Sequence, residues 1–122
     1  MAKILVVDDE VHLRVLYKAE FESEGYEVQV AANEQEAHGT VAAFKPSVII
    51  LDIELGDGNG LQLLKQLREQ LQDCSIILHT AYSTYKADFQ SWLADAYIIK
   101  SSDLRPLKAK VKELLTKESC GK

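Results

Sequence analysis

Short apolar segments, each four to six residues long, recur along the chain and are separated by longer amphipathic stretches. Segments of this length that are rich in β-branched residues and bounded by polar residues predict strands. The predicted strands are Ile4–Val7, Tyr26–Ala31, Val48–Leu51, Ser75–His79 and Ala96–Ile99. The segment at 26–31 alternates apolar and polar positions, as expected for an edge strand. The uninterrupted run at 4–7 is typical of a strand buried in a parallel sheet.

The stretches that follow the strands carry apolar residues three or four positions apart, which is the spacing of one face of an α-helix. The helical stripes are Leu13, Leu16, Tyr17 and Phe21; Ala37, Val41 and Phe44; Leu64, Leu67 and Leu71; Phe89, Trp92 and Leu93; and Leu107, Val111, Leu114 and Leu115. The stripe at 89–93 is weaker and more polar than the others. Such a stripe fits a helix that shifts easily and equally a helix that is merely solvated.

Capping residues mark several helix ends. Gly25 follows the first stripe and suits a helix C-terminus. Asn33, with Glu36 three residues later, has the pattern of a capping box at the start of the second helix, and Pro46 ends that helix. Asp103 is positioned to cap the last helix.

Regular alternation of strand and helix predicts an α/β fold. Right-handed crossover connections place the strands parallel in one sheet and cover both faces of the sheet with helices. We therefore expect a doubly wound, five-stranded parallel sheet. The length of 122 residues is that of one domain, and we assign residues 1–118 to the domain and residues 119–122 to a frayed tail.

The composition, with 47% hydrophobic and 27% charged residues, is ordinary for a soluble protein. No apolar run approaches the length of a membrane span, and MAKILVVDDE lacks the features of a signal peptide, so we expect a cytoplasmic protein without membrane insertion. A formal net charge of −5 argues against direct binding of nucleic acid, which requires clustered Lys and Arg. Cys74 and Cys120 are far apart and without a C-x-x-C motif, so we expect two free thiols.

Polar residues of particular kinds stand where the predicted strands end. The first strand runs into Asp8 and Asp9, the third into Asp52, the fourth into Thr80 and the fifth into Lys100. Ligands of an open α/β sheet bind outside the carboxyl ends of its strands, so we expect these side chains to converge in one crevice. Taken singly, each has a simpler explanation as a helix cap, a turn residue or a surface ion pair. Three acids, a hydroxyl and a lysine at four strand ends are together hard to assign to caps alone.

Three carboxylates in one crevice repel one another. At an effective dielectric constant of about 20, two unit charges about 4 Å apart interact by about 4 kcal/mol, and one lysine cannot neutralise three acids. A divalent cation can, and oxygen ligands without nearby His or Cys favour a hard ion such as Mg²⁺ over zinc. Magnesium held by few carboxylates is typical of sites that also hold phosphate, and a carboxylate can act as the nucleophile in aspartyl-phosphate chemistry. The residues therefore predict phosphoryl transfer.

In order and spacing, these residues resemble the response-regulator receiver domain family of two-component signal transduction, over essentially the whole chain. The match consists of Asp8-Asp9 after KILVV, Asp52 within VIILDIELGDGNG, Thr80-Ala81 after SIILH and Lys100 after AYII, with Tyr97 three residues before the lysine. Each motif alone is weak, whereas the ordered set is specific. The resemblance implies a flavodoxin-like sheet with strand order 2-1-3-4-5.

The resemblance also implies a role for each site residue. Asp52 is the expected phosphoacceptor and a ligand of Mg²⁺. The other expected metal ligands are Asp8, Asp9 and the backbone carbonyl of Glu54. Lys100 is expected to pair with the phosphoryl group. The phosphodonor would be a phosphohistidine on a sensor histidine kinase or on a histidine phosphotransfer protein.

Thr80 and Tyr97 occupy the positions of the family's conformational switch. After phosphorylation, Thr80 would move to hydrogen-bond the phosphoryl group, and Tyr97 would turn into the space vacated. The moving surface would comprise the fourth helix, fifth strand and fifth helix, and would control a downstream protein effector. Such a protein assists its own phosphorylation and dephosphorylation and is not a turnover enzyme. The chain is either a stand-alone receiver, which Met1 and the short tail favour, or a piece of a longer protein.

Three positions refine or depart from the family pattern. Ser101 stands where a proline preceded by a cis peptide bond is common, and a cis bond before a non-proline residue costs about 2.5–4 kcal/mol, so the geometry of that turn stays open. Leu55-Gly56 replaces a common Met-Pro pair, and glycines at every second position over 56–60 predict a more flexible loop. Tyr82 stands where the family tunes loss of the phosphoryl group, and we expect its aromatic ring to shield the acyl phosphate partly from water.

Three other functions fit parts of the pattern. A flavodoxin-like cofactor binder needs a phosphate-binding loop rich in Gly, Ser or Thr after the first strand, and DDEVH would repel phosphate unless a metal intervened. A phosphatase with an aspartate nucleophile usually carries a second acid two residues later, and Glu54 stands two residues after Asp52. A degenerate receiver would bind partners without phosphorylation, but all five site residues are present.

Overall fold

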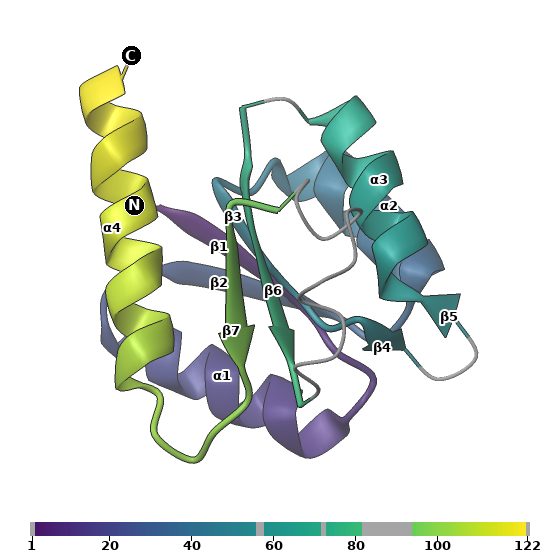
Figure 1. Ribbon diagram of the computed structural model, residues 1–122, viewed down its shortest axis with the longest axis horizontal. Coiled ribbons are helices and arrows are strands. Elements are labelled where there is room, and N and C mark those ends of the chain that lie inside the picture. Colours follow the sequence, from purple (N-terminus) through teal and green to yellow (C-terminus); the bar gives the residue numbers. More distant parts are fainter. Residues whose placement is uncertain (1, 56–57, 72, 82–93, 122) are drawn as a thin grey trace.

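All five predicted strands are present and pair in parallel in one sheet (Figure 1). The computed structural model describes residues 2–55, 58–71, 73–81 and 94–121. The strands of the sheet are β1 (Lys3–Val7), β2 (Glu27–Ala31), β3 (Val48–Leu51), β6 (Ser75–Thr80) and β7 (Ala96–Ile99). Their order across the sheet is β2-β1-β3-β6-β7, which confirms the predicted order 2-1-3-4-5.

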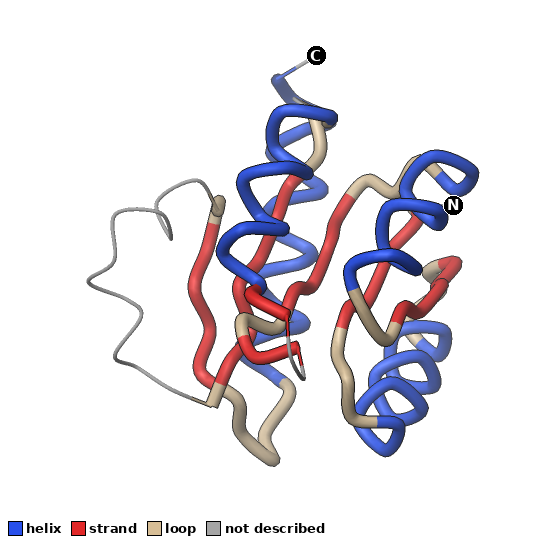
Figure 2. The backbone as a smooth tube through the Cα atoms, turned by 90° about the vertical axis from the view of Figure 1, so that its right-hand side faces the viewer, coloured by secondary structure: helices blue, strands red, loops and turns tan. Residues whose placement is uncertain are grey.

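Helices cover both faces of the sheet, as expected for a doubly wound fold. On one face lie α1 (Val11–Ser23) and α4 (Arg105–Gly121), and on the other lie α2 (Glu34–Phe44) and α3 (Gly60–Gln70). Figure 2 gives the same arrangement turned by 90°. Because the helices occupy the faces, the carboxyl ends of the strands stay open at one edge of the sheet.

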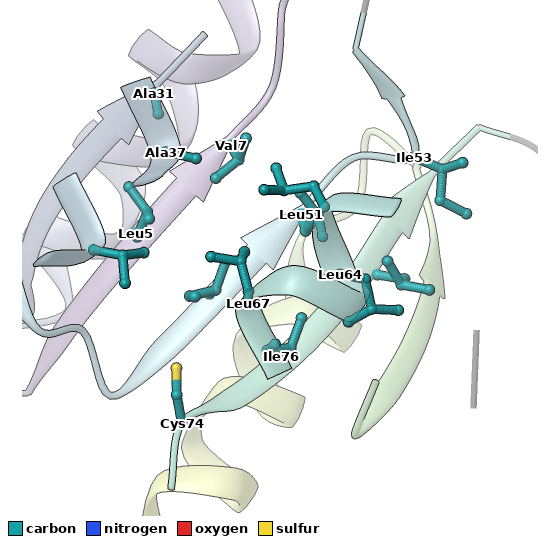
Figure 3. Packing of buried hydrophobic residues seen from close by; sticks show 14 residues of the cluster. Leu5, Val7, Ala31, Ala37, Leu51, Ile53, Leu64, Leu67, Cys74 and Ile76 are labelled. Atoms are coloured by element: carbon teal, nitrogen blue, oxygen red, sulfur yellow. The ribbon is translucent and has the colours of Figure 1, made fainter. Parts of the chain in front are cut away.

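The apolar side chains form two clusters, one on each face of the sheet. Alternate residues of a strand point to opposite faces, so β1 contributes to both clusters. Leu5 and Val7 pack on the side of α2 and α3 (Figure 3), whereas Ile4 and Val6 pack on the side of α1 and α4. The four side chains are 0–1% exposed. Burial on both faces explains why this strand reads as a continuous apolar run.

The capping residues perform the roles that the sequence predicts. Gly25 follows α1 with a φ of 96°, a conformation that favours glycine. Asn33 Oδ1 accepts a hydrogen bond from the backbone N–H of Glu36 at 2.9 Å, and the carboxylate of Glu36 accepts one from the residue before Asn33 at 2.8 Å. Asp103 Oδ1 accepts a hydrogen bond from the backbone N–H of Arg105, the first residue of α4, at 3.0 Å.

The segment after Asp52 has more regular structure than its glycines predict. Two short strands, β4 (Glu54–Leu55) and β5 (Gly58–Asn59), pair antiparallel, and α3 begins directly at Gly60. The backbone N–H of Gly60 donates to the carbonyl of Ile53 at 2.7 Å, which ties the start of α3 to the segment that follows β3. The expected flexible loop over 56–60 is thus replaced, in its described part, by a strand pair and a helix start.

Two expectations fall on residues outside the described ranges: the helical stripe at 89–93 and the shielding role of Tyr82. The open question at Ser101 has an answer, because no cis peptide bond occurs among the described residues and the bond before Ser101 is therefore trans.

The last helix is longer than predicted. It continues to Gly121, so the backbone of residues 119–121, which we assigned to a frayed tail, is helical. The domain boundary at residue 118 stays a prediction. None of the described helices combines the length and the apolar character that are needed to cross a bilayer.

Candidate functional site

The carboxyl ends of four neighbouring strands bring the predicted site residues together. Asp8 follows β1, Asp52 follows β3, Thr80 ends β6 and Lys100 follows β7. Backbone hydrogen bonds join these ends: the N–H of Asp52 donates to the carbonyl of Val7 at 2.9 Å, and the N–H of Lys100 donates to the carbonyl of Thr80 at 2.7 Å. The expected convergence at one edge of the sheet is confirmed.

Three carboxylates form a compact acidic cluster at this edge. One carboxylate oxygen from each of Asp8, Asp9 and Asp52 lies within 4.8 Å of the other two. Asp8 and Asp52 are 2% and 4% exposed, whereas Asp9 is exposed. Because water screens the two buried charges poorly, their repulsion is strong unless a cation offsets it.

One cation, the ammonium of Lys100, bridges the two buried carboxylates. Its Nζ lies 2.8 Å from Asp8 Oδ2 and 3.0 Å from Asp52 Oδ2. Burial lowers the pKa of Lys100, but the hydrogen bonds and charges of Asp8 and Asp52 outweigh burial and raise that pKa above its ordinary value. Lys100 is therefore charged at neutral pH, and its single charge faces three carboxylates.

Two side-chain hydrogen bonds to the backbone order the turn between β1 and α1. Asp8 Oδ1 accepts a hydrogen bond from the backbone N–H of Glu10 at 2.9 Å. Nη1 of Arg14, a residue of α1, donates to the backbone carbonyl of Asp8 at 2.7 Å. Asp8 thus orders the turn with one oxygen, as its simpler explanation predicts, and pairs with Lys100 through the other.

The two expected switch residues lie on the same face of the sheet. Thr80 is fully buried at the end of β6, and Tyr97 of β7 is partly buried against the cluster on the α2–α3 side. Tyr97 is aligned with Leu78, two residues before Thr80 on the neighbouring strand. Because strand side chains alternate between faces, Thr80 and Tyr97 share the face to which Leu78 points.

Two buried rings on the opposite face, Tyr17 of α1 and His79 of β6, lie beside the charged residues. Their ring centroids are 5.3 Å apart, and each side chain is 2% exposed. Burial raises the pKa of Tyr17, and the charge of nearby Lys100 opposes that rise. Burial, aided by the charge of Lys100, lowers the pKa of His79 from 6.5 to about 4. Nδ1 of His79 has no hydrogen-bond partner among the described residues, so the imidazole, which the lowered pKa keeps neutral, is enclosed beside the ring of Tyr17.

The start of α3 approaches the backbone of Asp52 so closely that only glycine fits. A Cβ atom at Gly60 would lie 2.4 Å from the carbonyl oxygen of Asp52 and 2.5 Å from Cα of Ile53. Both neighbours are backbone atoms, which cannot move without moving Asp52. Gly60 therefore fixes the path of the chain just after the central acid.

Three residues at the site, Arg14, Gly60 and His79, have roles that were not predicted from the sequence. The position of Arg14, five residues after Asp9 on a predicted helix, is a usable signal, because a long side chain there reaches back to the turn. His79 is a polar residue at the end of an apolar run, which is also visible in the sequence. The close approach at Gly60 joins two elements in space, and no sequence signal distinguishes this glycine from its neighbours in the loop.

The donor atoms at the site suit a hard divalent cation. The metal-ligand-type residues that the described structure gathers here are all carboxylates: Asp8, Asp9 and Asp52. Oxygen ligands favour Mg²⁺ over zinc, and three acids facing one lysine leave negative charge for a divalent ion to neutralise. The residues therefore fit Mg²⁺. Glu54, whose carbonyl we expected as a further ligand, lies in β4, two residues after Asp52.

Comparison with known proteins identifies the family. The sequence model of the response regulator receiver domain matches residues 4–112. The chain belongs to the response-regulator receiver domain family. Membership classes this receiver domain with the phosphorylation-activated switches of two-component signalling, and favours that interpretation over a flavodoxin-like cofactor binder.

The receiver domain is similar to transcriptional regulators in sequence and to response regulators of known structure. The phosphate regulon transcriptional regulatory protein PhoB of Pseudomonas aeruginosa is 35% identical over 122 residues, which cover 97% of this chain and 53% of that protein. The response regulator TrrA of Thermotoga maritima, solved in complex with Mg²⁺-BeF, is 45% identical with a TM-score of 0.89, covering 93% of this chain and 99% of that one. A structure of the histidine kinase ThkA in complex with TrrA matches with 45% identity and a TM-score of 0.87, covering 94% and 99%. The receiver domain thus spans about half the length of PhoB and nearly all of TrrA.

Proposed function

We propose that this receiver domain accepts a phosphoryl group on Asp52 in a Mg²⁺-dependent reaction and thereby switches the surface that it presents to a protein effector. The proposal rests on the meeting of three carboxylates and Lys100 at one edge of the sheet. Asp52 is the proposed acceptor because it follows β3, the central strand of the five. Asp8 flanks it on one side, and Thr80 and Lys100 flank it on the other.

In the proposed transfer, a carboxylate oxygen of Asp52 attacks the phosphorus atom of a phosphohistidine. The oxygen–phosphorus bond forms as the phosphorus–nitrogen bond breaks, and the electron pair leaves on the imidazole nitrogen. Lys100, whose ammonium lies 3.0 Å from Asp52 Oδ2, would hold a phosphoryl oxygen by charge. The hydroxyl of Thr80 would donate a hydrogen bond to another.

The proposed metal ligands are Asp8, Asp9, Asp52 and the backbone carbonyl of Glu54. When bound, Mg²⁺ neutralises negative charge on the carboxylates and on the transferring phosphoryl oxygens. Asp8 is oriented in advance by the N–H of Glu10 and by Lys100. Asp9 is the exposed member of the cluster and would meet an ion arriving from solvent first.

The proposed switch consists of Thr80 and Tyr97. Phosphorylation adds about one negative charge and new acceptor oxygens beside Thr80, which favours a position of the hydroxyl that contacts them. Thr80 is buried, so its movement would open space on the face that it shares with Tyr97. The responding surface would include the helix predicted at 89–93, β7 and α4, and would bind the downstream protein effector.

The proposed phosphodonor is a sensor histidine kinase or a histidine phosphotransfer protein. The structure of TrrA with the kinase ThkA supports this choice by similarity. On this chain, Val11 and Val15 are 54% and 64% exposed, and they lie four residues apart on α1, directly after the acidic turn. An exposed apolar pair on the helix that follows the acidic turn suits docking of a donor helix.

We further propose that the receiver domain acts by protein contact in the cytoplasm, without direct binding of nucleic acid and without turnover of an external substrate. The net charge of −5 supports the absence of nucleic-acid contact. An acceptor that keeps its phosphoryl group until hydrolysis is a switch, whereas a phosphatase would release phosphate repeatedly.

Amide NMR spectra of the ¹⁵N-labelled chain provide the test. Beryllofluoride, which substitutes for a phosphoryl group, is added with Mg²⁺. We expect shifts at Thr80, at Tyr97 and along β7 and α4 only when both are present, and no such shifts in Asp52→Asn. Absence of these shifts in the wild type would contradict the proposal. Sustained turnover of p-nitrophenyl phosphate would replace it by a phosphatase.

A further inference from the structure

The three acids differ in how their carboxylates are held. Asp8 is fixed by the N–H of Glu10 and by Lys100, and Asp52 is held by Lys100. The carboxylate of Asp9 makes no hydrogen bond or ion pair with the described part of the chain. Its oxygen nevertheless lies within 4.8 Å of those of the other two acids. The position of the Asp9 carboxylate therefore depends on the backbone that carries it.

Arg14 holds that backbone. Its Nη1 donates to the carbonyl oxygen of Asp8 at 2.7 Å, and this oxygen belongs to the peptide group that joins Asp8 to Asp9. The N–H of Arg14 also donates to the carbonyl of Glu10 at 3.1 Å, so the side chain starts from the helix turn that follows the acids. A short, charge-assisted hydrogen bond of this kind fixes the plane of the peptide.

We infer that Arg14 is a positioning residue for the metal site: it orients the Asp8–Asp9 peptide so that the Asp9 carboxylate faces Asp8 and Asp52. This inference rests on the proposed function, since it assumes that the acidic cluster holds Mg²⁺. Residues that orient metal ligands commonly change metal affinity when they are replaced.

The direction in which Mg²⁺ affinity changes when Arg14 is replaced distinguishes a positioning role from a purely electrostatic one. A cation beside an acidic cluster repels Mg²⁺, so loss of the Arg14 charge alone would tighten Mg²⁺ binding. Loss of a bond that positions Asp9 would weaken it. A purely structural role would lower the stability of the fold and leave Mg²⁺ affinity unchanged.

The test measures the dissociation constant of Mg²⁺ by isothermal titration calorimetry with the full chain. Arg14→Met keeps the length of the stem and removes charge and donor, and Arg14→Lys keeps the charge and a donor. Lys18→Met is the matched control, because Lys18 is also a cation of α1 that donates to a backbone carbonyl, that of Val28 at 2.9 Å. Far-UV circular dichroism verifies the fold of each variant.

We expect Arg14→Met to raise the Mg²⁺ dissociation constant about tenfold, Arg14→Lys to recover part of the loss, and Lys18→Met to match the wild type. Unchanged or tighter binding in a folded Arg14→Met variant would overturn the inference. If Arg14→Met fails to fold, Arg14→Gln takes its place, because the shorter neutral side chain also lacks the charge and reaches the Asp8 carbonyl less well; unchanged or tighter Mg²⁺ binding in that folded variant would overturn the inference. Failure of the proposed function is a distinct result, because the wild type itself would then show no Mg²⁺ binding.

Discussion

The buried imidazole of His79 should make the receiver domain lose stability in mild acid. His79 is 2% exposed, packs against the ring of Tyr17 and has no hydrogen-bond partner for Nδ1 among the described residues. Burial, together with the charge of Lys100, lowers its pKa from 6.5 to about 4. The folded protein therefore keeps this imidazole neutral at a pH where the unfolded chain protonates it.

The direction and size of the effect follow from linkage. The pKa of His79 is lower in the folded protein than in the unfolded chain, so the unfolded chain binds the proton first. As the pH falls, proton binding therefore stabilises the unfolded state relative to the folded one. The contribution of the neutral imidazole of His79 to the free energy of unfolding is complete above about pH 6.5, declines as the pH falls toward 4, and changes no further below about pH 4. At about 1.4 kcal/mol per pKa unit, the full loss is about 3 kcal/mol, of which about 2 kcal/mol has developed at about pH 5.

Urea unfolding followed by circular dichroism, in metal-free buffer at about pH 7 and about pH 5, measures this loss. His79→Phe keeps an aromatic ring against Tyr17 and cannot titrate. The acidic cluster is the same in both proteins, so the quantity of interest is the difference between their pH dependences. His12→Gln is the control, since it also removes one imidazole, but an exposed one at the start of α1.

Between about pH 7 and about pH 5, the free energy of unfolding of the wild type should fall by about 2 kcal/mol more than that of His79→Phe. His12→Gln should show the same fall as the wild type. Equal losses in the wild type and in His79→Phe would refute the reasoning, because they would mean that the folded protein accommodates a charged imidazole at this position.

Two further substitutions test the surroundings of Asp52. Gly60→Ala should lower the free energy of unfolding in urea by about 2 kcal/mol or more, because its Cβ would lie 2.4 Å from a backbone oxygen. The control is Gly39→Ala inside α2, where a Cβ meets nothing within 4 Å; this variant should instead be up to about 1 kcal/mol more stable than the wild type. Equal effects of the two substitutions would contradict the packing argument. Asp9→Asn should be up to about 1 kcal/mol more stable than the wild type without metal, and should lose the rise in melting temperature that Mg²⁺ gives the wild type. An Asp9→Asn variant of unchanged stability that still gains melting temperature with Mg²⁺ would show that the Asp9 carboxylate takes no part in holding the ion.

Much of the fold is predictable from this sequence because the strands have a distinct pattern. The runs at 4–7 and 48–51 are buried on both faces, so they are continuous and apolar, and the polar residue that ends each run is also the residue that enters the site. The chemistry of the site is thus visible at the strand ends. The order of the strands came from the family resemblance, because alternation alone does not specify which strand lies beside which.

Features that depend on contact between distant elements are not visible in this way. Glycines after Asp52 read as a flexible loop, yet Gly58 lies in β5 and Gly60 starts α3 against the backbone of Asp52. His79 reads as the polar end of a strand, and only the packing of α1 on the sheet shows that its imidazole is buried against Tyr17. In both cases the deciding contact is made between different elements of the fold.

The identity of the phosphoacceptor is tested most directly by intact mass spectrometry. The chain is incubated with acetyl phosphate, with Mg²⁺ or with a chelator, alongside Asp52→Ala. The wild type with Mg²⁺ should gain the mass of one phosphoryl group, and neither the chelated sample nor Asp52→Ala should gain it. An equal gain in Asp52→Ala would contradict the assignment of Asp52, and no gain in the wild type would contradict the account of this acidic edge as a phosphoryl-accepting site.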